Sequence, residues 1–197
     1  MAHRTGLRSG FTLIELLIVL AVVAVVLTLA APSFSSFILM QRLKSINAQV
    51  VTDLQYARSE AVSRGIPVHM KFRLAGGSVQ TSCYILYTST ITPAPPCNCA
   101  AAEGSRCTNA ATAELRTVQV QASLGVFIAI DPGDNFSFDP RTGGMVYGTY
   151  DYIGPPPEEY RIDVYADSAR KLRDVLGPSG RVKVCRPSGS TIAGEPC

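Results

Sequence analysis

Two hydrophobic patterns follow one another in the first third of the chain. The 21 residues from Phe11 to Ala31 carry one charge, Glu15, and are long enough for a helix to cross a hydrocarbon core of roughly 30 Å. Beyond Pro32, apolar residues recur three or four apart on one helix face, at Leu39, Leu43, Ile46, Val50, Leu54, Ala57 and Ala61. The polar face is assigned to Gln41, Arg42, Lys44, Asn47, Gln49 and Asp53. These patterns predict one long helix over about 11–64, amphipathic in its second half and ending near Gly65.

From residue 66 the pattern changes to short runs rich in Val, Ile, Tyr and Phe. Turn clusters such as "DPGDN", "DPRTGG" and "GPPP" separate these runs. The predicted strands are 66–73, 83–89, 115–122, 125–130, 136–139, 145–148, 160–166, 171–176 and 181–185. Their spacing predicts an antiparallel sheet, and a long helix packed on such a sheet is an α+β fold.

Charge near the N-terminus predicts the membrane topology. The ten residues before Phe11 carry Arg4 and Arg8 and no acid, so the N-terminus is expected to stay in the cytoplasm. The residues after Pro32 are then expected on the far side of the membrane. The predicted organisation is a leader (1–10), a transmembrane or filament-core helix (11–31), its amphipathic continuation (32–64) and an exported β-rich head domain (65–197).

Six cysteines all follow the predicted membrane segment. Cysteines of an exported domain are more often paired than free. Cys185 and Cys197 are predicted to pair and to close the last 13 residues into a loop. The pairing of the other four stays open, and they are Cys83, Cys97, Cys99 and Cys107. Zinc is the alternative for the last three of these, but disulfides are favoured because no histidine lies nearby.

The sequence gives little support to catalysis. His3 lies in the leader, and His69 lies mid-strand without an obvious acid or nucleophile beside it, so it is interpreted as a packed or surface residue. Asp131, Asp134 and Asp139 do not have the spacing of an EF-hand and are interpreted as turn residues. No phosphate-binding loop is present. We therefore expect no enzyme activity, no metal and no cofactor.

The segment "SGFTLIELLIVLAVVAVV", residues 9–26, resembles the class III signal sequence of the type IV pilin-like superfamily. The resemblance implies that a prepilin peptidase cuts between Gly10 and Phe11 and that the new amine of Phe11 is methylated. It also implies that the subunit leaves the inner membrane for a filament, where its N-terminal helix contacts other major and minor pilins. Glu15 is expected to pair with the Phe11 amine of its own or a neighbouring subunit, and such a pair in a dry core fixes the register of assembly.

Three further segments narrow the resemblance. "LQYARSEAVSRGIPVHM" (54–70), "FSFDPRTGG" (136–144) and "GRVKVC" (180–185) look like FimT/FimU-like minor pilins and GspH-type minor pseudopilins. FimT-like minor pilins are associated with DNA uptake through a C-terminal Gly-Arg-x-Arg motif. Gly180 and Arg181 match this motif, whereas Lys183 takes the place of its second arginine and lacks the bidentate fork.

The segment from Arg170 to Arg186 is strongly basic. It contains one acid, Asp174, and six cations, which are Arg170, Lys171, Arg173, Arg181, Lys183 and Arg186. A hairpin is predicted here, with Val182 and Val184 pointing to the core. Such a strip suits the phosphate backbone of double-stranded DNA, and the absence of interleaved aromatics argues against single-strand selectivity. Protection of a sheet edge and docking onto neighbouring minor pilins are the alternatives.

The leading prediction is therefore a minor type IV pilin, with double-stranded DNA as a candidate partner in natural transformation. The alternative is a GspH-type minor pseudopilin of a type II secretion system. Both imply a single pass through the inner membrane with a periplasmic head domain, followed by incorporation into a pilus or pseudopilus. A third class, an unprocessed membrane-anchored enzyme or receptor, would keep its N-terminus intact.

Overall fold

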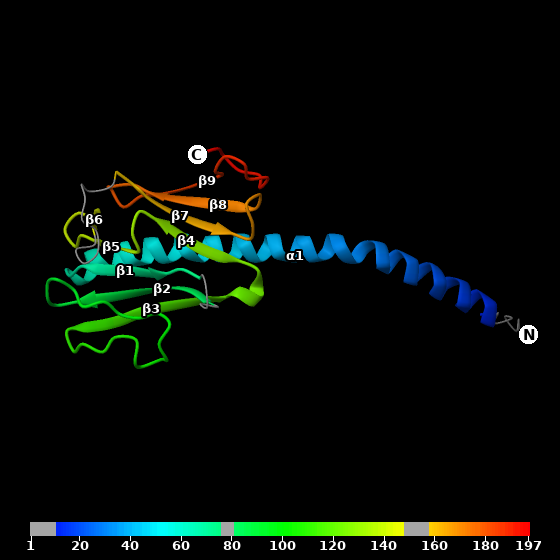
Figure 1. The fold of residues 1–197 in the computed structure, drawn as a ribbon, viewed down its shortest axis with the longest axis horizontal. Helices are drawn as coiled ribbons and strands as arrows, with labels where there is room; N and C mark the ends of the chain where they lie inside the picture. The colour runs from blue at the N-terminus through cyan, green and yellow to red at the C-terminus, as the bar shows by residue number, and fades with distance from the viewer. Residues whose placement is uncertain (1–10, 76–80, 148–157) are drawn as a thin grey trace, which may run out of the picture. The chain divides into compact units, whose positions relative to one another are not determined.

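A computed structural model describes residues 11–75, 81–147 and 158–197. The chain forms two compact units, Met1–Ile38 and Leu39–Cys197. The predicted helix is α1, Leu13–Arg64, which belongs to both units (Figure 1). The Gly65 N–H donates to the carbonyl oxygen of Ala61 at 3.0 Å and closes the last turn, so the predicted end of the helix is confirmed. Among the described residues, no helix combines the length and hydropathy that mark a membrane span.

The described part of the chain contains a strand at each of the nine predicted places. These strands are β1 Val68–Arg73, β2 Thr81–Ser89, β3 Thr112–Gln121, β4 Phe127–Asp131, β5 Asn135–Phe138, β6 Met145–Tyr147, β7 Tyr160–Tyr165, β8 Lys171–Leu176 and β9 Val182–Cys185. A short 3-10 helix, Ala122–Leu124, follows β3. Within the described residues the strands pair in two sheets, in the orders β3-β2-β1-β5-β6 and β4-β7-β8-β9, and every strand pair is antiparallel. The predicted α+β architecture is therefore confirmed.

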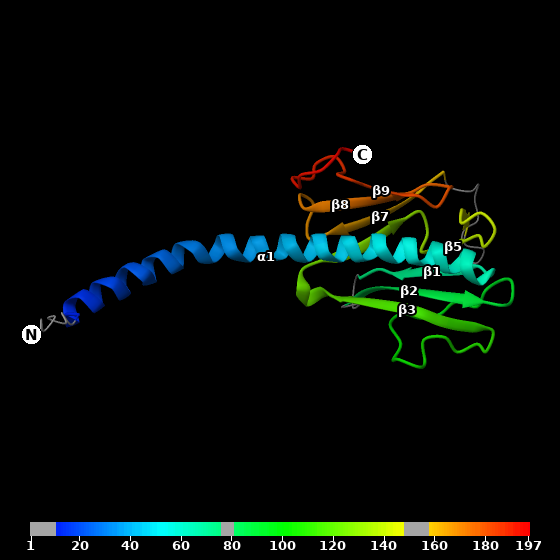
Figure 2. The ribbon, with the colours of Figure 1, turned by 180° about the vertical axis from the view of Figure 1, so that it is seen from behind.

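The second half of α1 packs against one face of both sheets (Figures 1 and 2). The predicted apolar helix face supplies the fully buried side chains Leu43, Val50, Leu54, Ala57 and Ala61. The sheets add alternate residues of each strand to the same core, such as Val68, Met70 and Phe72 of β1 and Ile162 and Val164 of β7. Strands of period two and a helix of period 3.6 thus bury one face each.

Two residues that the sequence pattern placed on the polar face of the helix are buried. Asn47 is 4% exposed and Asp53 is fully buried. Asn47 lies four residues after Leu43 and three before Val50, so its spacing puts it inside the apolar stripe. The polar side chains are accommodated because each one finds a partner on a sheet, as described below.

The outer face of the five-stranded sheet, turned away from α1, is covered by a loop that follows β2. Disulfides join Cys83 to Cys99 and Cys97 to Cys107. These cysteines form a second, smaller core with Ile85, Tyr87 and Ala94. Strand β2 is consequently buried on both of its faces. All six cysteines are in disulfides, so the zinc alternative has no free thiol to supply ligands.

Candidate functional site

The N-terminal motif begins the helix. The Glu15 N–H donates to Oγ1 of Thr12 at 3.3 Å, and Glu15 lies in the first turn of α1, where the helix dipole favours a carboxylate. Gly10 lies outside the described residues, so the predicted cleavage site is not covered on its leader side. Phe11 is 86% exposed, and the helix that follows has exposed apolar side chains on every side from Leu13 to Leu27. Within the described residues Glu15 has no cationic partner.

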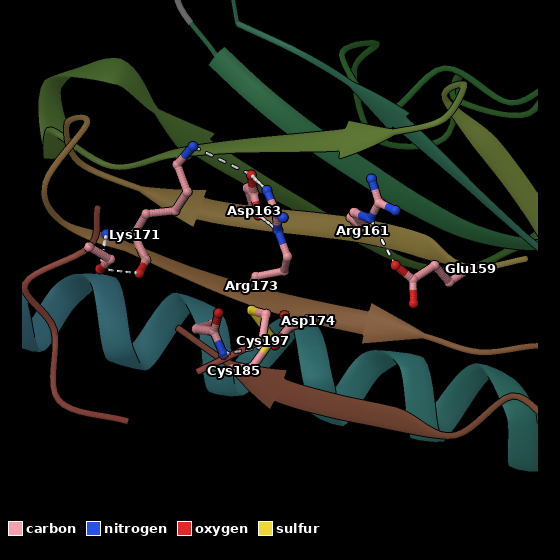
Figure 3. The surroundings of a disulfide bond; sticks show 10 residues. Glu159, Arg161, Asp163, Lys171, Arg173, Asp174, Cys185 and Cys197 are labelled. Atoms are coloured by element: carbon pink, nitrogen blue, oxygen red, sulfur yellow. Dashed lines mark hydrogen bonds and ion pairs between the residues drawn. A yellow bond between two sulfur atoms is a disulfide. The ribbon is translucent and has the colours of Figure 1, made fainter. Parts of the chain in front are cut away.

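The structure divides the six predicted DNA-binding cations into two groups. The three cations of the first group, Arg170, Lys171 and Arg173, are paired with two acids. Arg173 of β8 donates from Nε and Nη2 to the two carboxylate oxygens of Asp163 on β7, at 2.7 and 2.9 Å (Figure 3). Lys171 Nζ lies 3.5 Å from Oδ2 of the same carboxylate. This hydrogen bonding raises the pKa of Arg173 further.

Arg170 has its own acid partner in the turn between β7 and β8. Its Nε and Nη2 donate to Oδ2 of Asp167 at 2.8 and 2.6 Å. The Asp167 carboxylate also accepts from the backbone N–H groups of Ala169 and Arg170. Hydrogen bonds from the Arg170 side chain lower the pKa of Asp167, which keeps the carboxylate ionised and the turn closed.

The second group consists of Arg181, Lys183 and Arg186, and none of them has an acidic partner among the described residues. They lie on or beside β9, the edge strand of the four-stranded sheet. Arg181 and Lys183 are exposed, and Arg186 is half-buried. The disulfide from Cys185 to Cys197 joins β9 to the C-terminal loop, and the Arg186 N–H donates to the carbonyl oxygen of Glu195 at 2.6 Å. The carbonyl of Arg186 in turn accepts from the Cys197 N–H at 3.1 Å, so the backbone of Arg186 is fixed.

The predicted burial of Val184 was wrong. Val184 pairs with Asp174 on the inner side of β9 but is 43% exposed, and β9 is the edge strand of its sheet. Asp174, the single acid of the basic segment, faces inward from β8 and is fully buried. Asn47 of α1 donates from Nδ2 to Oδ1 of Asp174 at 3.1 Å. Burial raises the pKa of Asp174 to about 7, so this acid does not compensate the cations of the outer face.

A second buried polar group lies between α1 and the five-stranded sheet. The Tyr84 hydroxyl of β2 donates to Oδ2 of Asp53 at 2.7 Å, and Nη1 of Arg116 on β3 lies 2.8 Å from Oδ1. Burial raises the pKa of Asp53, while the Tyr84 hydrogen bond and the Arg116 charge oppose the rise. Each sheet is thus joined to the helix through a buried carboxyl group, Asp53 for the five-stranded sheet and Asp174 for the four-stranded sheet.

The three segments that carry the narrower resemblance meet at one point. Arg58 of α1 donates from Nε to the carbonyl oxygen of Gly143 at 3.0 Å. Gly180 has a φ of +72°, and a Cβ there would lie 2.2 Å from the Gly143 oxygen and 3.3 Å from Arg58 Nε. The glycine of the Gly-Arg-Val-Lys sequence is therefore required by this packing and by its left-handed backbone. The Met145 N–H also donates to the carbonyl of Pro178 at 2.9 Å, which ties β6 to the same turn.

The other candidates have structural roles. His69 stacks on Tyr87 with ring centroids 5.2 Å apart, and burial lowers its pKa to about 4. Asp139 accepts hydrogen bonds from the backbone of Arg141 and Thr142, as expected of a turn residue. Asp131 Oδ2 lies 3.9 Å from Nη1 of Arg161, and Asp134 Oδ2 lies 3.4 Å from Nζ of Lys71. In the described ranges, no group of three or more potential ligands is arranged to hold a metal ion.

Comparison with known proteins identifies the family of this chain. The prokaryotic N-terminal methylation motif matches residues 7–31. The family described as type II transport protein GspH matches residues 48–168, more than half of the chain. This chain belongs to the GspH family. The resemblance to the type IV pilin-like superfamily is thereby confirmed, and the GspH-family protein is minor pilin- or pseudopilin-like.

Two solved structures of the type IV minor pilin FimU of Pseudomonas aeruginosa strain PAO1 are similar to this GspH-family chain. The first is 18% identical and covers 78% of this chain and 95% of FimU, with a TM-score of 0.49. The second crystal form is 17% identical and covers 77% and 98%, with a TM-score of 0.46. No curated protein matches the chain.

Sequence reasoning missed the aromatic part of the outer face in this GspH-family protein. Tyr165 of β7 lies beside Phe127 of β4, with ring centroids 5.7 Å apart, and Lys171 Nζ lies 5.6 Å above the Tyr165 ring. The antiparallel register pairs Phe127 with Tyr165 and Tyr165 with Lys171, and the order of the strands is not readable from the sequence. Aromatics therefore do accompany a cation on this face, at Lys171, which also pairs with Asp163.

Proposed function

We propose that this chain is a non-enzymatic minor subunit of a type IV pilus that binds double-stranded DNA through Arg181, Lys183 and Arg186. Maturation by a prepilin peptidase between Gly10 and Phe11, followed by methylation of Phe11, is part of the proposal. The unmatured subunit would span the inner membrane through residues 11–31 with the head domain in the periplasm. The N-terminal methylation motif over residues 7–31 supports this route.

Glu15 has an assembly role in this proposal. Its carboxylate has no cationic partner among the described residues and lies four positions from Phe11, whose amine becomes a free cation after cleavage. A charge in an apolar filament core is costly unless it is paired. The Phe11 amine of the same or a neighbouring subunit meets that need, so other pilins would be the partners of the N-terminal helix.

The observation that carries DNA binding is the division of the cations into neutralised and free groups. Asp163 and Asp167 compensate the cations of β8 and its preceding turn. The three cations on and beside β9 have no acidic partner among the described residues, and each can release counterions from a phosphate backbone. Lysine and arginine contacts of this kind give affinity for DNA without sequence reading.

The test is the affinity of the full-length chain for duplex DNA in a non-ionic detergent, over roughly 50–200 mM salt. Replacement of Arg181, Lys183 and Arg186 by alanine should reduce the slope of log affinity against log salt by about 3, since each phosphate contact contributes about 1. The matched control replaces Arg170, Lys171 and Arg173 by alanine, which changes the net charge equally. The control should leave the slope within about 1 of the parent.

Two outcomes would overturn DNA binding. If the parent does not bind at low salt, the head domain has no DNA surface. If both triple variants lose the same slope, net charge and not the free group determines affinity.

The second candidate is a minor pseudopilin of a type II secretion system, in which the free cations face another pseudopilin or an exported protein. The GspH family is described as a type II transport protein, which favours this reading. The position of the gene separates the two, because a minor pilin is encoded beside other minor pilins and a pseudopilin inside a secretion operon.

A further inference from the structure

The contact between Gly143 and Gly180 brings cations from three distant segments together within the unit Leu39–Cys197. Arg58 comes from α1, Arg141 from the turn after β5, and Arg181 from the end of the β8–β9 turn. Arg58 Nε bonds the carbonyl of Gly143, and Gly143 is two residues after Arg141. Gly180 packs on both Gly143 and Arg58 and directly precedes Arg181. The chain itself therefore keeps the backbones of these cations close together.

These cations have little local compensation. Arg141 and Arg181 are exposed, Arg58 is half-buried, and none of the three forms an ion pair with an acid among the described residues. The nearest acid of the turn is Asp139, whose carboxylate accepts from the N–H groups of Arg141 and Thr142 and from the Thr142 hydroxyl. Glu60 on the same helix is paired with Arg64. The end of the molecule around Gly180 is accordingly basic.

A groove of about 470 Å³ extends from this point along the helix. Its lining is Gln55, Arg58, Ser59, Val62 and Ser63 of α1 with Thr142 and Gly143 of the turn, and it contains no acid. Arginine, serine, threonine and glutamine are among the side chains that contact phosphate and sugar oxygens. The Ser59 and Ser63 hydroxyls donate to helix carbonyls, so each hydroxyl has to rotate away from its carbonyl to donate to a phosphate oxygen.

We propose that this groove carries the phosphate backbone of bound DNA away from Arg181, with Arg58 and Arg141 as further phosphate-binding residues. The inference rests on the proposed function and extends its site from the β8–β9 hairpin to the helix. The carbonyl end of α1 is the less favourable end for an anion. Arg58 lies six residues before that end, and the cations around Gly180 supply the attraction.

The test places a charge in the groove without touching the Arg58 contact. Ser59→Glu and Ser59→Gln are compared in the full-length chain in detergent with duplex DNA at about 50 mM salt. Ser59 is exposed, so neither variant disturbs the core. Ser59→Glu should weaken binding by about fivefold or more through repulsion of the phosphates, whereas Ser59→Gln should remain within about twofold of the parent.

Removal of Arg141 gives a second readout. Arg141→Gln should reduce the salt slope by about 1, as expected for one phosphate contact. Arg73→Gln is the matched control, because Arg73 is an exposed cation of the five-stranded sheet with no acidic partner in the described residues, and its slope should not change.

The outcomes separate this inference from the proposed function. If the β9 triple variant loses binding while Ser59→Glu equals Ser59→Gln and Arg141→Gln equals Arg73→Gln, the groove is wrong and the hairpin surface stands. If the parent does not bind DNA, both proposals fail together.

Discussion

The outer faces of the two sheets are built in different ways. On the five-stranded sheet, two disulfides hold a loop over β2 and create a second apolar core. On the four-stranded sheet the outer face carries ion pairs across β7 and β8, and the Cys185–Cys197 disulfide holds the C-terminal loop beside β9. Among the described residues of the basic segment, the cations without an acidic partner lie on and beside the β9 edge. The outer face of the five-stranded sheet therefore contributes to the stability of the fold, whereas the β9 edge of the four-stranded sheet is available for a charged partner.

The inner faces differ in a related way. One acid is buried between α1 and each sheet, Asp53 of α1 and Asp174 of β8, but the two acids are compensated unequally. Asp53 has a hydroxyl and a guanidinium beside it, whereas Asp174 has one amide hydrogen bond, from Asn47. An uncompensated carboxyl responds by holding its proton. Asp174 should therefore make the four-stranded side lose stability as the pH rises.

The largest expected effect is this pH dependence of stability. Burial raises the pKa of Asp174 from 3.8 to about 7, so between these values the folded state keeps a proton that the unfolded state has released. The contribution to the free energy of unfolding is thus largest below about pH 4 and is lost as the pH rises toward 7. A shift of about three units corresponds to about 4 kcal/mol.

Urea unfolding of the full-length chain at several pH values between about 4 and 7 measures this effect. Asp174→Asn should remove the loss of stability toward pH 7 that Asp174 causes, while keeping a side chain of the same size. Burial lowers the pKa of His69 to about 4, so the His69 contribution to stability increases as the pH rises over this range. The slope left in the variant should therefore have the opposite sign to the Asp174 contribution, reduced by Asp53, whose pKa burial raises. An unchanged slope in Asp174→Asn would show that the Asn47–Asp174 contact is not the titrating element.

The disulfides provide a second, slightly smaller effect that sharpens the comparison between the two sheets. Cys83 and Cys99 are 16 residues apart, and Cys185 and Cys197 are 12 apart. Loops of similar length should contribute similarly, so the serine double variants at either pair should each lose about 3 kcal/mol of unfolding free energy. Stability alone will therefore not distinguish the two sheets.

Binding should distinguish them. Only the Cys185→Ser/Cys197→Ser variant should lose affinity for DNA, because the C-terminal loop fixes the backbone of Arg186 through Glu195 and Cys197. The Cys83→Ser/Cys99→Ser variant is the matched control, measured at a temperature where both variants remain folded. Equal affinities in the two variants would mean that the loop does not position the cation.

Patterns of hydrophobicity were sufficient for the elements but not for the charges. The spacing of Leu43, Val50 and Leu54 predicts the buried helix face, and short runs rich in Val, Ile, Tyr and Phe between turn clusters predict every described strand. Charge compensation depends on which strands become neighbours, and the sequence does not give that order. Asp163 and Asp167 lie outside the basic segment in sequence, yet the β7–β8 pairing and turn place them beside its cations.

The environment of the buried acids was not predicted either. Asp174 was counted with the basic segment because its neighbours in sequence are basic. Its position two residues from Leu172 and Leu176 puts it on the inner side of β8 by simple alternation. The role of Gly180 could not be predicted from the sequence either, since Gly180 packs on Gly143, in a turn about 37 residues earlier in the chain.

The smallest expected effect tests the edge of the four-stranded sheet directly. Lys183→Arg converts the sequence from Gly180 to Lys183 into Gly-Arg-Val-Arg without changing the net charge. An arginine fork can hold a phosphate by two hydrogen bonds where an ammonium acts as a point charge, so affinity for duplex DNA should rise by about two- to threefold at constant salt slope. Arg173→Lys is the mirror control, because the fork it removes is used on Asp163, and DNA affinity should stay unchanged. If Arg173→Lys weakens binding as much as Lys183→Arg strengthens it, the ion-paired cations of β8 also contact DNA. The presence of an acidic partner would then not separate the cations that bind DNA from those that do not.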